Sequence, residues 1–166
     1  MIRNAVPADH AALLDLWQKN ATGQGYAPRP DAEVDRLLFS HPYFSYKHTF
    51  IREEQGRAVA FTCGCVGDDI PRGKERGYFT CLVAEPQWDT PETTAQLLNA
   101  LEDSFRAVGR TASAVTFFNP MHLPWVLPGS PGHEHNNMPG IATDLPLHDR
   151  MLAHGYTCLL YTSPSP

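Results

Sequence analysis

Apolar and polar positions along this chain follow two periods, one typical of strands and one typical of helices. Short apolar or alternating runs predict strands at residues 2–6, 46–53, 57–66, 78–84 and 114–118. Apolar residues three and four positions apart predict helices that begin at Asp9, Asp31 and Thr90, and a short one over residues 147–154. This order predicts an α/β domain in which a sheet carries helices on both faces.

The helix that begins at Thr90 has the clearest boundaries in the sequence. Thr90 is a residue type that caps helices, Pro91 suits the first helical position, and Gly109 suits the position after the last turn. Between them, one apolar stripe repeats at helical spacing: Leu97, Leu98, Leu101, Phe105 and Val108. We therefore predict a continuous helix over residues 90–108.

Composition narrows the classes of protein that the pattern allows. With 166 residues, 42% of them apolar and 19% charged, the chain has the size and composition of one globular domain. The net charge of −5 argues against a nucleic-acid partner, and no run approaches the roughly 20 apolar residues of a membrane helix. The first residues lack the regions of a signal peptide, so we expect a cytoplasmic protein.

The end of the chain differs in character from the rest. Residues 158–166 read CLLYTSPSP, which resembles the translation of a transposase adapter used in sequencing libraries. We interpret them as such an artefact, with one domain over residues 1–157 and a native chain that continues past Thr157. The alternative is a genuine strand followed by a Ser/Pro tail.

Three stretches, in this order and spacing, resemble the Gcn5-related N-acetyltransferase (GNAT) family. They are IRNAVPADHAALLDLW, then CLVAEPQW followed by AQLLNALEDSF, and finally LHDRMLAHGYT. The resemblance implies a mixed, mostly antiparallel sheet flanked by helices, with the fourth and fifth strands parallel and diverging and the last strands truncated. The segment NPMHLPWVLPGSPGHEHNNMPG resembles an insert of tandem two-domain members, so we also expect a second GNAT-like domain in the full-length chain.

The same resemblance implies a site for acetyl-CoA. In the family, the pantetheine arm lies between the fourth and fifth strands on backbone groups that match Leu82, Val83 and Ala84. The pyrophosphate rests at the N-terminus of the next helix, where free N–H groups and the helix dipole favour anions. Asn119 matches a family residue that faces the cofactor side of the gap.

The phosphate loop departs from the family pattern. Asp89, Glu92 and Thr94 stand at its key positions, so the glycines that allow backbone to approach phosphates are absent. The hydroxyls of Thr90, Thr93 and Thr94 could contact the cofactor instead. A capped, purely structural helix explains the same residues, and the sequence leaves both readings open.

The catalytic positions of the family are also altered. Tyr78 stands where an acidic base often lies, and Met151 replaces the Tyr that often protonates the leaving thiolate. His148 lies one helical turn before Met151 on the same face, so it is our candidate for proton transfer. The alternative is a half-exposed surface histidine.

A long histidine-rich loop precedes the last helix. Trp125, His133 and His135 are predicted to contact the acceptor substrate as a lid. Alternatively, His133 and His135 bind a transition metal together with His148 or Asp144, or the loop is a solvated connection.

The resulting hypothesis is transfer of an acetyl group from acetyl-CoA to an amine of a small molecule. Fourth-strand amides would polarise the thioester, and a neutral amine would attack it directly. The alternatives are a non-catalytic GNAT-like lobe of a two-domain protein and a metal-binding protein that uses the loop histidines.

Overall fold

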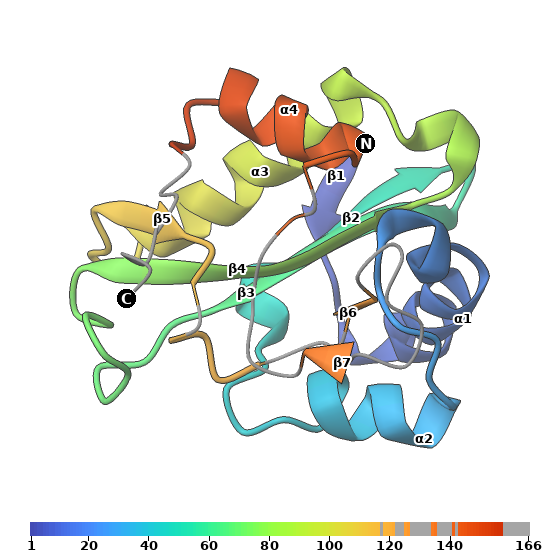
Figure 1. Ribbon diagram of the computed structural model, residues 1–166. Coiled ribbons are helices and arrows are strands. Elements are labelled where there is room, and N and C mark those ends of the chain that lie inside the picture. The colour runs from blue at the N-terminus through green and yellow to red at the C-terminus, as the bar shows by residue number, and fades with distance from the viewer. Residues whose placement is uncertain (117, 122–124, 127–133, 136–140, 142, 158–166) are drawn as a thin grey trace, which may run out of the picture.

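The computed structural model describes residues 1–116, 118–121, 125–126, 134–135, 141 and 143–157. Its main sheet has the strand order β1-β2-β3-β4-β5 (Figure 1). The strands are β1 (Ile2–Asn4), β2 (Thr49–Glu54), β3 (Arg57–Cys65), β4 (Arg76–Ala84) and β5 (Ala112–Ala114). Neighbours from β1 to β4 pair antiparallel, and β5 pairs parallel with β4, which confirms the predicted mixed sheet.

Helices cover both faces of this sheet, as predicted. They are α1 (His10–Asn20), α2 (Asp31–Val34), α3 (Pro91–Arg106) and α4 (Pro146–Ala153), with a π-helical turn, η3 (Asp35–Phe39), directly after α2. One core packs α1 and α2 against the sheet, and a second packs α3 and α4 against the opposite face. In the described part of the chain, no helix has the length and apolar character to cross a bilayer.

Short 3-10 turns and a small second sheet connect these elements. The turns are η1 (Pro7–Asp9), η2 (Ala21–Gln24), η4 (Tyr46–His48) and η5 (Pro86–Trp88). The second sheet pairs β6 (Trp125–Val126) antiparallel with β7 (Glu134–His135). The expected artefact at residues 158–166 lies outside the described residues.

Two predicted strands are wrong by three or more residues at one end, and the other strand ends differ by at most two residues. Residues 46–48 form η4 rather than the start of β2, because the Ser45 hydroxyl accepts a hydrogen bond from the Lys47 N–H and caps a turn. The fifth strand pairs at Ala112–Ala114 rather than at residues 114–118. Val115 and Phe118 after it are partly buried against the two cores and belong to no strand.

Phe105 of α3 fills a space that two glycines leave open on the sheet. An added Cβ on Gly77 would lie 2.2 Å from the Phe105 ring, and one on Gly64 would lie 2.6 Å from its Cζ. Both glycines are on the central strands, β4 and β3. Their missing side chains therefore set how closely α3 approaches the sheet.

His48 is buried beside Phe105, and its Nδ1 lies 2.9 Å from the Ser104 hydroxyl. Burial, with a smaller contribution from Lys47, lowers the pKa of His48. Because the folded pKa is below the unfolded one, the contribution of neutral His48 to stability is complete above about pH 6.5 and is lost as pH falls through the folded pKa.

We therefore expect wild-type protein to lose more stability between about pH 7.5 and pH 5 than a His48→Gln variant does. Urea unfolding at the two pH values measures the difference. His10→Gln provides a control at a half-exposed histidine. Equal pH dependence in wild type and the His48 variant would contradict this assignment.

Candidate functional site

A β-bulge in β4 separates this strand from β5. Cys63 of β3 pairs with Cys81, but the next residue, Gly64, pairs with Phe79, which leaves Thr80 as an extra residue in β4. A bulge bends its strand and increases the local twist. The last pair between β4 and β5 is Tyr78 with Ala114, just before the bulge. The two strands therefore diverge from this point toward the C-terminal end of β4.

Asn119 connects the chain after β5 to the bulge. Its Nδ2 donates to the carbonyl of Phe79 at 3.1 Å and to the Thr80 hydroxyl at 2.9 Å. Its Oδ1 accepts from the Met121 N–H at 2.9 Å and from the Cys65 thiol at 3.3 Å. The side chain is buried and its amide is fully used, so its predicted contact with a cofactor stays a prediction.

Beyond the bulge, the edge of β4 is hydrogen-bonded to side chains of η2 and of the residues that follow η2, and not to β5. The Gln24 side chain donates from Nε2 to the Ala84 carbonyl at 2.9 Å, and its Oε1 accepts from the Ala84 N–H at 3.2 Å. The Tyr26 hydroxyl is hydrogen-bonded to the Leu82 backbone, and burial raises the pKa of Tyr26. All three predicted β4 residues pair with β3, but successive residues of a strand direct their N–H and carbonyl groups to opposite edges. Of the three predicted β4 residues, Leu82 and Ala84 therefore direct backbone groups into the divergence.

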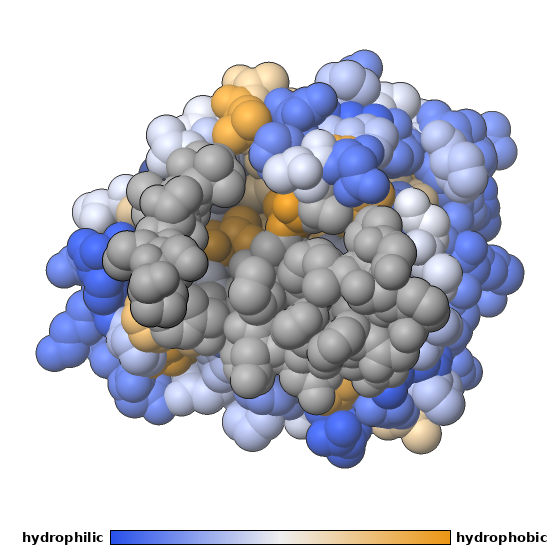
Figure 2. Space-filling model, in the orientation of Figure 1, coloured by the Kyte–Doolittle hydropathy of each residue, from blue (hydrophilic) through white to orange (hydrophobic). Residues whose placement is uncertain are grey.

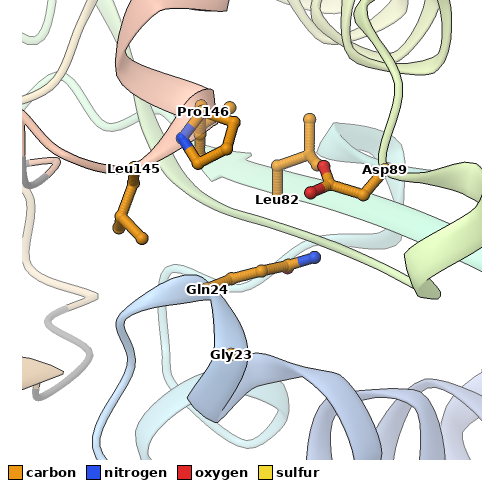
Figure 3. A pocket seen from close by; sticks show the side chains of 7 residues that line it. Gly23, Gln24, Leu82, Asp89, Leu145 and Pro146 are labelled. Carbon is orange, nitrogen blue, oxygen red and sulfur yellow. The ribbon is translucent and has the colours of Figure 1, made fainter.

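A small pocket lies at this edge. It is lined by residues from η2, β4, the start of α3 and the start of α4: Gly23, Gln24, Leu82, Asp89, Leu145, Pro146 and Leu147. Figure 3 shows the Gln24 side chain extending beneath Leu82 and Asp89. On the surface, apolar residues gather in a hollow below α4 (Figure 2). The free volume of about 20 Å³ admits a water molecule but not a pantetheine arm.

The N-terminus of α3 is closed by its own residues. The Thr90 hydroxyl accepts from the Thr93 N–H at 3.2 Å, the Thr94 N–H donates to the Thr90 carbonyl, and Pro91 has no N–H. Thr93 and Thr94 are buried. Of the first-turn amides, only that of Glu92, an acidic residue, is left for an anion. The cap accounts for Thr90 and the Thr93 N–H without a ligand, while the buried Thr94 hydroxyl has no hydrogen-bond partner among the described residues. Contact of these three hydroxyls with the cofactor stays a prediction.

Sequence reasoning missed Arg150, which lies beside this helix start. From α4, it forms an ion pair with Asp89 and donates from Nη2 to the Asp89 carbonyl at 2.7 Å. The pair offsets one of the two acids at the helix start. The sequence gives no sign that this arginine has a binding partner, because basic residues on short surface helices are usually solvated.

The arrangement of the sheet identifies the fold. Similarity to solved structures extends to an agmatine N-acetyltransferase, with a TM-score of 0.55 and 14% identity over 68% of this chain and 73% of that chain. An aminoglycoside N-acetyltransferase in complex with CoA gives a TM-score of 0.51 and 16% identity, over 69% of this chain and 74% of that chain. The chain has the GNAT fold.

Other comparisons show that the similarity to known proteins is restricted to the fold. The chain spans 24% of the matched N-acetylglutamate synthase from Neisseria gonorrhoeae, at 19% identity over 68% of this chain and a TM-score of 0.48. Neither a scan against protein-family models nor a search of the curated proteins finds a match. Identities this low show a shared GNAT fold alone.

The altered catalytic positions of the GNAT fold are structural here. Tyr78 is buried and its hydroxyl donates to the Pro71 carbonyl, while Met151 is part of the core. His148 is hydrogen-bonded through Nδ1 to the exposed Asp149, at 2.9 Å, and does not line the pocket. Its role in proton transfer stays a prediction.

The predicted substrate lid cannot be placed as a site. His133 lies outside the described residues, and for Trp125 and His135 only the backbone, in β6 and β7, is described. Asp144 is exposed. Among the residues that the structure describes, no cluster of three metal-binding side chains occurs. The lid and metal hypotheses therefore stay predictions.

Proposed function

We propose that this domain is an N-acetyltransferase that transfers an acetyl group from acetyl-CoA to an amine of a small molecule. The observation that carries the proposal is the edge of β4 beyond the bulge, where Ala84 already holds a carboxamide through both its N–H and its carbonyl. A pantetheine arm contains amides of the same chemistry, and among the described residues the diverging strands leave this edge of β4 without a strand partner.

The same backbone groups provide a means of catalysis. The Ala84 N–H now donates to the amide oxygen of Gln24. Directed at a thioester oxygen, a donor in this position would stabilise the negative charge that develops when an amine attacks. Orientation of the two substrates would supply much of the remaining rate enhancement.

The acceptor class is supported by the names of the similar structures. One is an agmatine N-acetyltransferase and another acts on aminoglycosides by name, so both names specify an amine acceptor. The particular amine remains open. A second GNAT-like domain in the full-length chain and a cytoplasmic location are part of the same proposal.

The closed start of α3 predicts an unusual preference for the donor. The capping of Thr93 by Thr90, the acid Glu92 and the pairing of Arg150 with Asp89 leave few groups free to attract the pyrophosphate of CoA. We therefore expect acetyl-CoA and S-acetylpantetheine to bind with affinities that differ by less than about fivefold, or about 1 kcal/mol.

Calorimetric titration with both donors tests the binding, and release of free thiol in the presence of a panel of primary amines tests the transfer. Binding of both donors with amine-dependent thiol release is the expected result. A strong preference for acetyl-CoA would show that the nucleotide half is recognised after all. If neither donor binds to the wild type or to a Gln24→Ala variant, the proposed function is contradicted.

A non-catalytic GNAT-like lobe is the second candidate. It is favoured by the capped helix start and by the small free volume beside Leu82. This candidate predicts that neither donor binds even when the Gln24 side chain is removed. Donor binding by the wild type and by Gln24→Ala therefore separates the two candidates.

A further inference from the structure

We propose that Gln24 is a gate that occupies the donor site with its own carboxamide and must swing away before an acyl donor binds. The inference rests on the proposed function, because it assigns a regulation to that same site. It is independent of the acceptor substrate.

The contacts of Gln24 imitate those of an amide ligand. Its Nε2 and Oε1 form one hydrogen bond each with the Ala84 carbonyl and N–H, at 2.9 and 3.2 Å, across 60 residues of sequence. The pantetheine arm carries the same kinds of group, an amide N–H and an amide carbonyl. A trans secondary amide directs them to opposite sides, so the two Ala84 groups would bind separate amides of the arm. A donor that binds at Ala84 therefore competes directly with this side chain.

The segment around Gln24 combines a position with freedom to move and positions that are held by packing. Gly23 and Gly25 flank Gln24, and Gly25 has φ +90°, a conformation that only glycine adopts readily. An added Cβ on Gly23 would meet no atom within 4 Å, so its backbone has open space beside it. Tyr26 is anchored, because its ring packs on Trp17 at a centroid distance of 4.9 Å. Gly25 is held as well, because an added Cβ there would lie 2.7 Å from Leu145 Cδ1 and its N–H donates to the Thr22 carbonyl at 3.3 Å. Rotation at Gly23 and about the side-chain bonds of Gln24 can release the carboxamide while Gly25 and Tyr26 hold the loop in place.

Movement of Gln24 away from Ala84 would enlarge the pocket toward the edge of β4, where a donor would bind. Gln24 is one of its lining residues, together with Leu82 of β4 and Leu145 before α4. Its side chain lies along one side of the pocket, beneath Leu82 and Asp89 (Figure 3). Removal of this side chain would leave the N–H and carbonyl of Ala84 without their Gln24 partners, next to the pocket.

The gate should therefore weaken donor binding in the wild-type protein. When the binding-competent state is only a fraction of the population, the apparent affinity falls by that fraction. Two hydrogen bonds from a partly buried side chain correspond to a roughly tenfold bias toward the closed state. We expect Gln24→Ala to bind acetyl-CoA and S-acetylpantetheine about tenfold more tightly than wild type.

A matched control is available in the same part of the chain. Gln18 is on α1, and its Nε2 donates to a backbone carbonyl, that of Arg29, at 2.8 Å. Gln18→Ala removes the same side chain and a comparable hydrogen bond without touching β4, so its donor affinity should equal that of wild type. Calorimetric titration of the three proteins with each donor gives the comparison.

Hydrogen exchange of the Ala84 amide tests the contact without any donor. This N–H should exchange about tenfold faster in Gln24→Ala than in wild type or Gln18→Ala, because its acceptor is lost. Equal exchange rates in the three proteins would show that Gln24 does not protect Ala84, and would overturn the gate.

The outcomes for the gate and for the proposed function are distinct. Equal donor affinity in wild type and Gln24→Ala overturns the gate and leaves the function intact. Absence of donor binding by all three proteins overturns the proposed function and, with it, the gate. Gln24 would then be a structural residue that stabilises the edge of β4. Tighter binding by Gln24→Ala alone supports both.

Discussion

Phe105→Ala is expected to reduce the free energy of unfolding by about 3–5 kcal/mol, the usual cost of removing a buried aromatic ring. The ring is 2% exposed and occupies the space over Gly64 and Gly77, where the backbone of the sheet comes close to α3. Since those glycines have no side chains that could move into the space, the cavity cannot collapse easily. Urea denaturation measures the loss.

Val108, which lies after the last turn of α3 and is 45% exposed, provides the control. Val108→Ala should change the free energy of unfolding by less than about 0.5 kcal/mol. A loss of less than about 1 kcal/mol for Phe105→Ala would show that the core rearranges around the missing ring, contrary to the packing described.

Asn119→Leu is expected to cost about 2–5 kcal/mol, because it leaves the Phe79 carbonyl and the Met121 N–H buried without their partner. The substitution keeps the approximate size of the side chain, so the loss reports on hydrogen bonding rather than on a cavity. It should also loosen the bulge, which hydrogen exchange of the β4 amides can detect. Denaturant unfolding gives the free energy.

Asn20→Leu is the comparison for this prediction. Asn20 donates a single hydrogen bond to the Leu16 carbonyl within its own helix, at 2.9 Å and only partly buried. Its loss should cost about 1 kcal/mol or less. Equal losses for the two asparagines would mean that Asn119 does not hold the bulge.

Local signals explain why much of the fold could be predicted. Thr90, Pro91 and Gly109 mark the ends of α3 through chemistry that depends only on neighbouring residues, and the observed cap hydrogen bond to the Thr93 N–H follows from it. The hairpin between β2 and β3 likewise follows from Gln55 and Gly56, both at positive φ. The missing glycines of the phosphate loop were visible in the sequence for the same reason.

The site itself depends on contacts that no local pattern encodes. The extra residue Thr80 is an ordinary strand residue, so the bulge that separates β4 from β5 has no mark in the sequence. Gln24 lies in a glycine-rich loop whose polar residues predict solvent exposure, whereas its partner Ala84 is 60 residues away. The paired part of β5 was misplaced because apolar character reports burial and not hydrogen bonding.

The unpaired edge of β4 also affects how the protein behaves at high concentration. A free strand edge is a template for aggregation, and proteins blunt such edges by covering their N–H and carbonyl groups. Here the carboxamide on Ala84 and the hydroxyl on Leu82 cover them. Each opening of Gln24 briefly uncovers the Ala84 groups, so a protein that lacks this side chain should self-associate more readily. A bound acyl donor should suppress that association by taking the same hydrogen bonds.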